Sequence, residues 1–236
     1  MSISGNNFTG EDCPPQETMG IKIINVEESV FAENDKIAQE NYKLLEKKGI
    51  VSFNFMGSPG SGKTTIIEEM IKKLKDKYKI GVIEGDIAGC LDSSRIEKLG
   101  IPVVQINTGG ACHLDANMVK KGLENLPIEN LNIIFIENVG NLVCPAEFKL
   151  GNKINIVVTS TTEGNDKPVK YPLMFNISEI CLLNKIDIED NYFEKDTFIK
   201  NLKKVNPDII VFELSARRGD NFEKYLDFLE NKLLNN

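Results

Sequence analysis

A run of eight residues near position 60 has the composition and spacing of a phosphate-binding loop. Gly57-Ser58-Pro59-Gly60-Ser61-Gly62-Lys63-Thr64 fits the pattern G-x-x-x-x-G-K-[ST] and lies between a predicted strand and a predicted helix. Its glycines let backbone N–H groups converge on phosphate oxygens, and the helix adds the positive end of its dipole. We expect Lys63 to reach the β- and γ-phosphates and the Thr64 hydroxyl to ligate magnesium. The predicted nucleotide-binding residues here are Gly57, Ser58, Gly60, Ser61, Gly62, Lys63, Thr64 and Thr65.

A second motif distinguishes GTP from ATP. Asn184-Lys185-Ile186-Asp187 follows an apolar run and matches the N-K-x-D signature of GTPases. The Asp187 carboxylate can accept hydrogen bonds from N1–H and the exocyclic amine of guanine, whereas adenine would present a lone pair there. Further on, Ser215-Ala216-Arg217 resembles the last GTPase motif, in which a backbone N–H meets guanine O6. The predicted base-reading residues are Asn184, Lys185, Asp187, Ser215, Ala216 and Arg217.

Acidic residues follow two other predicted strands. Asp86 could hold magnesium or its water shell, and Glu137 lies where an acidic residue beside the metal is expected. Gly140 could offer its N–H to the γ-phosphate. No glutamine stands beside Gly140, so we expect slow intrinsic hydrolysis. The predicted catalytic residues are Lys63, Thr64, Asp86 and Glu137, and the last three are the predicted magnesium ligands.

Cysteine and histidine side chains form a candidate centre for a second metal. Cys112 and His113, adjacent in the chain, lie between a predicted strand and a predicted helix, and a thiolate with an imidazole suits zinc or nickel. Cys144 follows Gly140 by only four residues, so nucleotide state could move a metal ligand. Adjacent side chains seldom point at one ion, and a two-fold dimer would supply further ligands across its interface.

The other cysteines do not suggest a disulfide framework. Five cysteines, an odd number, are scattered along the chain and are interpreted as reduced thiols or thiolate ligands. Cys181 is interpreted as a core residue, because it lies inside an apolar run. Cys90 is a bystander or an auxiliary ligand, and Cys13, which is isolated, receives no role.

The elements that must position these groups alternate along the chain. Apolar runs predict strands near 50–55, 79–85, 102–107, 131–138, 153–160, 179–185 and 208–214. Amphipathic segments between most of them predict helices, so we expect an α/β fold of the P-loop NTPase type: a mostly parallel sheet with helices on both faces. Ligands on such sheets bind at the carboxyl ends of the strands.

Domain organisation is predicted to be simple. Residues 1–20 are rich in Ser, Asn, Gly, Pro and acids, and we expect a mobile tail. Residues 21–236 are expected to form one P-loop domain that opens with a helix at about 29–48. The apolar stripe predicted for that helix comprises Val30, Ile37, Tyr42, Leu44 and Leu45.

Composition argues against two classes of partner. A formal charge of -7 offers no broad cationic surface to nucleic acid, and no apolar run approaches the roughly 20 residues that span a bilayer. The first residues also lack the order of a secretory signal. We therefore expect a cytoplasmic protein.

The motifs together resemble the HypB family of hydrogenase-maturation GTPases, within the dimerising P-loop GTPases, from about Val26 onward. The resemblance is carried by Cys112-His113-Leu114-Asp115, by the run 138–145 and by the run 162–172, whereas the urease counterpart has a Cys-Pro-His order. It implies a GTP-dependent homodimer with magnesium that binds nickel or zinc between protomers through Cys112, His113 and Cys144. It further implies transfer to a nickel metallochaperone or a hydrogenase large-subunit precursor, with Lys167 near the nucleotide.

This chain departs from the family pattern twice, and other interpretations stay open. It lacks an N-terminal cysteine cluster and a histidine-rich storage tract. The alternatives are a metal-dependent assembly module with little turnover, a urease-type nickel-insertion GTPase and a P-loop kinase for a small molecule. Each motif also has an ordinary explanation: a glycine-rich turn, a chance surface tetrapeptide, solvated carboxylates, a solvated lysine at Lys167, or a structural Cys and His.

Overall fold

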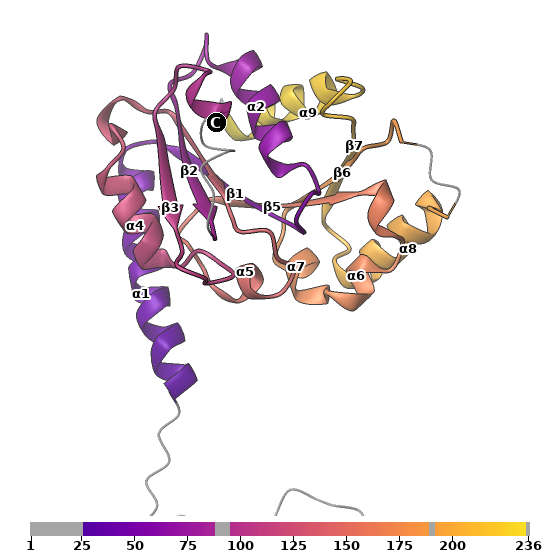
Figure 1. Ribbon diagram of the computed structural model, residues 1–236, viewed down its shortest axis with the longest axis horizontal. Helices are drawn as coiled ribbons and strands as arrows, with labels where there is room; N and C mark the ends of the chain where they lie inside the picture. The colour runs from indigo at the N-terminus through magenta and orange to yellow at the C-terminus, as the bar shows by residue number, and fades with distance from the viewer. Residues whose placement is uncertain (1–25, 88–94, 189–191, 235–236) are drawn as a thin grey trace, which may run out of the picture.

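The computed structural model describes residues 26–87, 95–188 and 192–234 (Figure 1). The predicted tail at 1–20, Cys13 and Cys90 lie outside these residues. Among the described helices, none has the length and apolar character needed to cross a membrane.

Seven parallel strands form one sheet, as the apolar runs predict, in the order β3-β2-β4-β1-β5-β6-β7. The strands are β1 (Val51–Met56), β2 (Ile80–Asp86), β3 (Val103–Asn107), β4 (Ile133–Glu137), β5 (Ile154–Ser160), β6 (Ile180–Asn184) and β7 (Ile210–Glu213). The predicted α/β P-loop architecture is confirmed. The central strand β1 leads into the phosphate loop.

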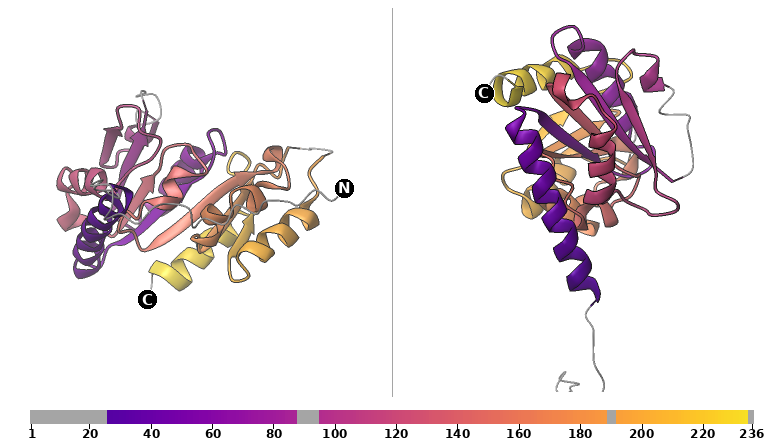
Figure 2. Two further views of the ribbon diagram at one scale, coloured as in Figure 1. Left: turned by 90° about the horizontal axis from the view of Figure 1, so that it is seen from below. Right: turned by 90° about the vertical axis from the view of Figure 1, so that its left-hand side faces the viewer.

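Helices cover both faces of the sheet because its buried strands are apolar on both sides (Figures 1 and 2). In β4, Ile133 and Phe135 pack toward α2 (Lys63–Leu74) and α9 (Phe222–Leu229), whereas Ile134 and Ile136 pack toward α4 (Ala116–Glu124). The second face also carries α1 (Val26–Lys47), α7 (Pro172–Asn176) and α8 (Lys195–Val205). Short helices complete the chain: η2 (Ile128–Asn130), α5 (Cys144–Glu147), η3 (Thr161–Glu163), α6 (Lys167–Lys170) and η4 (Glu230–Leu234).

Helix α1 confirms the predicted N-terminal helix but not its predicted apolar stripe. Val30, Tyr42 and Leu44 are 47%, 38% and 36% exposed, so that part of the prediction is wrong. Among residues 30–47 of α1, the buried ones are Asn34, Ala38, Asn41 and Leu45. The two asparagines are buried because their amides hydrogen-bond to backbone groups of other segments, which hydrophobic periodicity cannot reveal.

The carboxyl ends of all seven strands meet at one edge of the sheet, since every pair of neighbours is parallel. The predicted nucleotide and metal residues that the structure describes lie at the ends of these strands or in the segments that follow them. The topology therefore gathers distant motifs along one rim.

Candidate nucleotide cleft and cysteine–histidine centre

The phosphate-binding loop passes from β1 into α2. Gly62, the N-cap of α2, has φ 103° and no side chain to cap the first N–H groups, which leaves them available to an anion. A Cβ at Gly62 would lie 2.2 Å from the Asn184 Nδ2 atom, so only glycine fits beside that side chain. Lys63 is buried, and its Nζ atom donates to the carbonyls of Gly57 and Ser58 at 3.3 and 3.2 Å.

A cleft of about 490 Å³ opens beside this loop, within the size range of small-ligand sites. Its walls come from the loops after β1, β2 and β4, with Arg95 and Lys185. The predicted site residues that line it are Gly60, Gly62, Lys63, Thr64, Thr65, Asp86, Glu137, Gly140 and Lys185. The structure thus brings together the predicted phosphate and magnesium residues of three separate segments, with Lys185 from a fourth.

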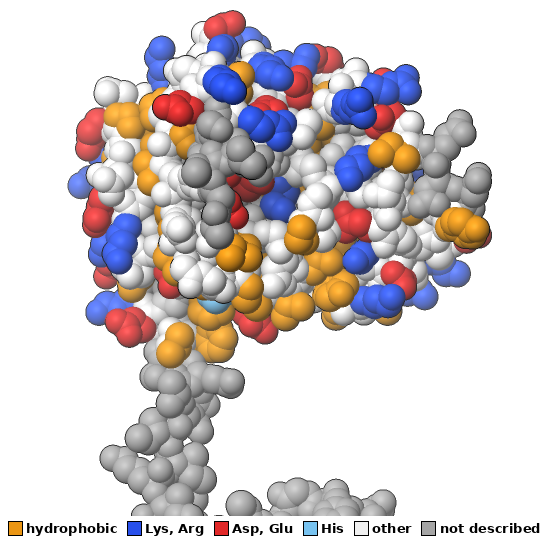
Figure 3. Space-filling model, viewed as in Figure 1, with side chains coloured by type: hydrophobic (Ala, Val, Ile, Leu, Met, Phe, Trp, Pro, Cys, Tyr) orange, Lys and Arg blue, Asp and Glu red, His pale blue; other side chains and the backbone are white. Residues whose placement is uncertain are grey.

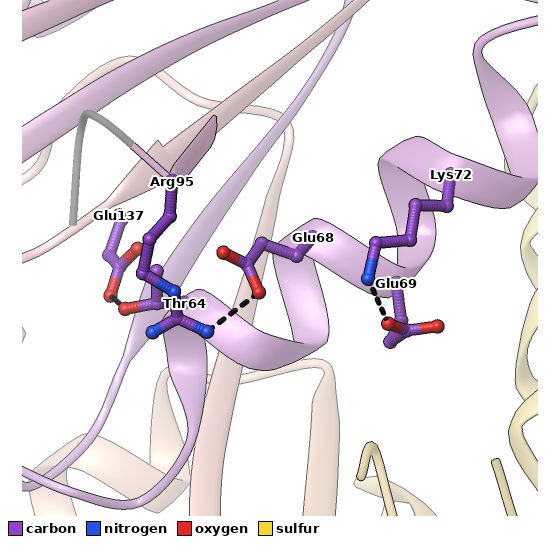
Figure 4. A network of polar contacts seen from close by, with 6 residues as sticks. All are labelled: Thr64, Glu68, Glu69, Lys72, Arg95 and Glu137. Atoms are coloured by element: carbon purple, nitrogen blue, oxygen red, sulfur yellow. Dashed lines mark hydrogen bonds and ion pairs between the residues drawn. The ribbon is translucent and has the colours of Figure 1, made fainter. Parts of the chain in front are cut away.

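Oxygen atoms suited to ligating magnesium lie around the N-terminus of α2. The Thr64 hydroxyl donates to Glu137 Oε1 at 2.7 Å (Figure 4), and Asp86 Oδ1 accepts from the Ile87 N–H at 2.6 Å. Hydroxyl and carboxylate oxygens are the hard donors that Mg²⁺ prefers, so Thr64, Glu137 and Asp86 fit this ion. Bound there, magnesium would supply charge stabilisation to a transferring phosphoryl group.

Arg95 is a cleft residue that motif analysis missed. Its guanidinium pairs with Glu68 of α2 at 2.7 Å, one turn beyond Thr64 (Figure 4). The only sequence signal is an arginine shortly after the Asp86 segment, which is no recognisable pattern.

The base-reading motifs contact one another and the phosphate loop. Asn184 donates to Ser61 O at 3.0 Å and accepts from the Ala216 N–H at 3.1 Å. Lys185, at φ 62°, donates from Nζ to Gly60 O at 2.7 Å. A hydrogen bond from Ser215 holds the pKa of Asp187 below its usual value, so the carboxylate is the form available as an acceptor.

The remaining predicted nucleotide residues lie outside the cleft walls. Gly57 pairs with Asn141, and Ser58 donates to Glu163. Lys167 lies with its Nζ atom 5.4 Å from the Tyr171 ring centroid. Arg217 is exposed in the loop after β7. Roles for these residues stay predictions.

Cys112, His113 and Cys144 converge within the single chain, with their donor atoms all within 4.8 Å of one another. Cys112 Sγ lies 2.7 Å from Cys144 Sγ and 3.9 Å from His113 Nδ1. The adjacent Cys112 and His113 side chains thus point to one place, although neighbours in sequence seldom do. Strand order explains how Cys144 joins them, because β3 and β4 both flank β2 and the segments that follow these two strands meet.

The donor set fits a borderline metal such as zinc or nickel. Metal bonds of 2.0–2.3 Å place two ligands of one tetrahedral ion roughly 3.3–3.8 Å apart, so the two sulfurs would separate by about 1 Å on binding. The Cys112 hydrogen bond, followed by burial, raises the pKa of Cys144, whereas burial lowers the pKa of His113 and favours its neutral, ligating form. Three donors among the described residues leave further positions for an outside ligand.

Neighbouring side chains orient this centre. The His113 ring stacks on the Phe148 ring with centroids 3.9 Å apart. The Phe148 ring centroid lies 5.1 Å from that of Phe31 of α1. Asn141 donates from its N–H to Gly57 O at 3.1 Å, and its Nδ2 atom lies 3.8 Å from Cys144 Sγ.

Cys181 is fully buried within the core, as predicted, and burial raises the pKa of its thiol.

A parallel sheet with a glycine-rich phosphate loop, and a thiol–imidazole centre on the same rim, define a P-loop nucleotide-binding protein with a candidate metal site. Residues 51–213 match the family model described as CobW/HypB/UreG, nucleotide-binding domain. The chain belongs to the HypB family of hydrogenase maturation factors.

Three relatives carry this assignment. A probable hydrogenase maturation factor HypB of Methanocaldococcus jannaschii is 44% identical over 89% of this chain and 96% of its own. The Rhizobium leguminosarum bv. viciae hydrogenase maturation factor HypB is 46% identical over 89% and 70%. A crystal structure of HypB from Helicobacter pylori in complex with nickel superposes with a TM-score of 0.80, at 38% identity, over 85% and 94%.

Proposed function

We propose that this chain is a GTPase metallochaperone that binds nickel, or zinc, at the Cys112, His113 and Cys144 centre under the control of GTP. It delivers nickel during [NiFe]-hydrogenase maturation in the cytoplasm. The observation that carries the proposal is the convergence of the three donor atoms within 4.8 Å, with Cys144 close behind Val139 and Gly140, which line the nucleotide cleft. The relatives named as hydrogenase maturation factors, one of them in complex with nickel, support the cargo.

The nucleotide is GTP, which Lys63 binds and orients with the loop amides while Asp187 reads guanine. Contacts among the Ser61, Asn184 and Ala216 segments support this assignment, because they hold the base-reading loops against the phosphate loop. Thr64, Asp86 and Glu137 hold magnesium, and the chain hydrolyses GTP slowly.

Coupling runs through residues 140–144. A Cβ at Gly140 would meet three Pro59 atoms at 3.0 Å, so this segment lies directly on the phosphate loop. Asn141 adds a backbone hydrogen bond to Gly57, and Cys144 follows three residues later. A γ-phosphate contact at Gly140 would therefore shift the Cys144 sulfur relative to Cys112.

The active form is a homodimer that completes the metal site and meets a nickel metallochaperone and a hydrogenase large-subunit precursor. The pale-blue histidine emerges among hydrophobic side chains at the lower edge of the molecule (Figure 3). Exposed apolar residues from three elements near that edge support a contact surface: Val30 and Phe31, Val143, and Leu173. A partner copy would supply the outside ligands.

Single-turnover hydrolysis tests the enzymatic half of this proposal. With protein in excess over GTP, we expect hydrolysis on the order of 10⁻³ per second, altered by nickel and abolished in Lys63→Ala. GTP that binds tightly but is never cleaved would instead identify a metal-dependent assembly module. ATP bound more tightly than GTP would favour the kinase.

A further inference from the structure

The buried side chain of Asn138 joins the nucleotide cleft to the loop that carries Cys112 and His113. Its Oδ1 atom accepts from the Leu114 N–H and from its own neighbour, the Val139 N–H, both at 3.0 Å. Its Nδ2 atom donates to Asn54 Oδ1 at 3.3 Å, and its N–H donates to Phe55 O at 3.0 Å. One residue, 1% exposed, thus connects β1, the end of β4 and the residue after His113.

We infer that Asn138 is a positioning residue that transmits nucleotide state to Cys112 and His113, an inference that rests on the proposed function. Residues 140–144 reach only the Cys144 half of the centre. Asn138 stands between Glu137, which contacts Thr64, and the cleft residues 139 and 140. Any displacement of this segment carries the Asn138 amide with it, and Leu114 follows through the shared hydrogen bond.

The Leu114 side chain is also held by tight packing against β2. Leu114 is fully buried, and a Cβ at Gly85 would lie 2.6 to 2.9 Å from three of its side-chain carbons. A buried N–H that loses its acceptor is costly, so the Leu114 amide stays with Asn138 rather than separating from it. His113 precedes Leu114 directly, and its ring is confined on the other side by Phe148.

Asn34 of α1 offers a matched control. Its Oδ1 atom accepts from the Ala116 N–H at 2.9 Å, two residues after Leu114, and its Nδ2 atom donates to Lys149 O at 2.9 Å. Asn34 is also buried, but neither of these partners lines the nucleotide cleft. It supports the same metal loop without a path to the phosphates.

The test measures nickel dissociation constants at saturating GDP and at saturating non-hydrolysable GTP analogue for wild type, Asn138→Ala and Asn34→Ala. We expect the two wild-type constants to differ by about 5-fold or more. In Asn138→Ala the ratio should fall below about 2-fold, whereas Asn34→Ala should weaken nickel binding in both states and keep the wild-type ratio. An Asn138→Ala protein with the wild-type ratio would overturn the inference and leave the proposed function standing; a wild-type ratio of one would overturn both.

The Leu114 amide of the wild-type protein, followed by NMR, tests the inference without a variant. This N–H should stay protected from hydrogen exchange in both nucleotide states, because its hydrogen bond to Asn138 moves as a unit, while its chemical shift should differ between the two states. An unchanged chemical shift, or protection lost in one state, beside a nucleotide-dependent nickel affinity, would show that another path carries the coupling.

Discussion

The Cys112, His113 and Cys144 side chains offer two sulfurs and an imidazole nitrogen, all within 4.8 Å. Such a donor set favours nickel or zinc over magnesium, for which we propose separate oxygen ligands at Thr64, Asp86 and Glu137. The two proposed ion sites therefore differ in ligand chemistry, so we expect that either can be removed without the other.

Replacing the Cys112 thiol tests the proposed nickel or zinc site. Cys112→Ala should weaken nickel binding by at least about 100-fold and leave GTP binding in place, since Cys112 does not line the cleft. Cys181→Ala is the control, because that thiol is fully buried in the core and should keep nickel binding. Equilibrium dialysis reports both, and full nickel stoichiometry and affinity in Cys112→Ala would refute the ligand assignment.

Residues that carry chemistry in fixed spacings could be found from the sequence, whereas solitary polar residues could not. The phosphate loop and the N-K-x-D motif are local patterns, and the structure gathers most of their residues around one cleft. Asn34, Asn138 and Arg95 have no such pattern. Their partners lie 115, 24 and 27 positions away, so only the folded chain reveals them.

At the scale of elements, two loops and one helix set the geometry of the metal centre. The loop after β3 carries Cys112, the segment between β4 and β5 carries Cys144, and α1 contacts a residue shortly after each cysteine. Asn41 of α1 donates to Ala116 O at 2.9 Å and to Leu150 O at 3.0 Å. The helix is thus a brace across the two ligand-bearing segments.

Loss of that brace should lower stability. Asn41→Ala leaves two buried carbonyls without their donor, and we expect the free energy of unfolding to fall by about 1–3 kcal/mol. Gln39→Ala, an exposed change on the same helix, should stay within about 0.5 kcal/mol. Denaturant unfolding measures both free energies. An equal loss of stability in the two variants would contradict the bracing role of Asn41.

The loop after β4 should discriminate between nucleotides. In Gly140→Ala the new methyl group meets three Pro59 atoms at 3.0 Å and displaces the loop from the phosphate side. We expect affinity for a GTP analogue to fall by about 10-fold, with GDP changed far less, because only GTP has a third phosphate for this loop. Equal losses for the two nucleotides would contradict a γ-phosphate contact at Gly140.

Strands were easier to predict than the buried face of a helix. All seven apolar runs became strands, because central strands of a parallel sheet are buried on both faces. The apolar stripe of α1 was wrong in part, because Asn34 and Asn41 occupy its buried face and satisfy backbone groups there. Apolar periodicity records hydrophobic burial and misses polar groups that are buried with partners.

At the scale of the whole molecule, strand order decides which loops can meet. The placement of β2 between β3 and β4 brings the loops of Cys112 and Cys144 together, and the central β1 sets the phosphate loop beside them. This order depends on long-range pairing that no local pattern encodes. The domain boundaries, the tail and the GTP-dependent dimer stay predictions.

A single titration tests the central claim, that nucleotide state controls the cysteine–histidine centre. Nickel is titrated into wild-type protein loaded with GDP or with a non-hydrolysable GTP analogue, while oligomeric state is followed by light scattering. We predict nickel dissociation constants that differ by about 5-fold or more, together with dimers in the GTP-analogue state. Identical nickel affinity and identical mass in the two states would contradict the account.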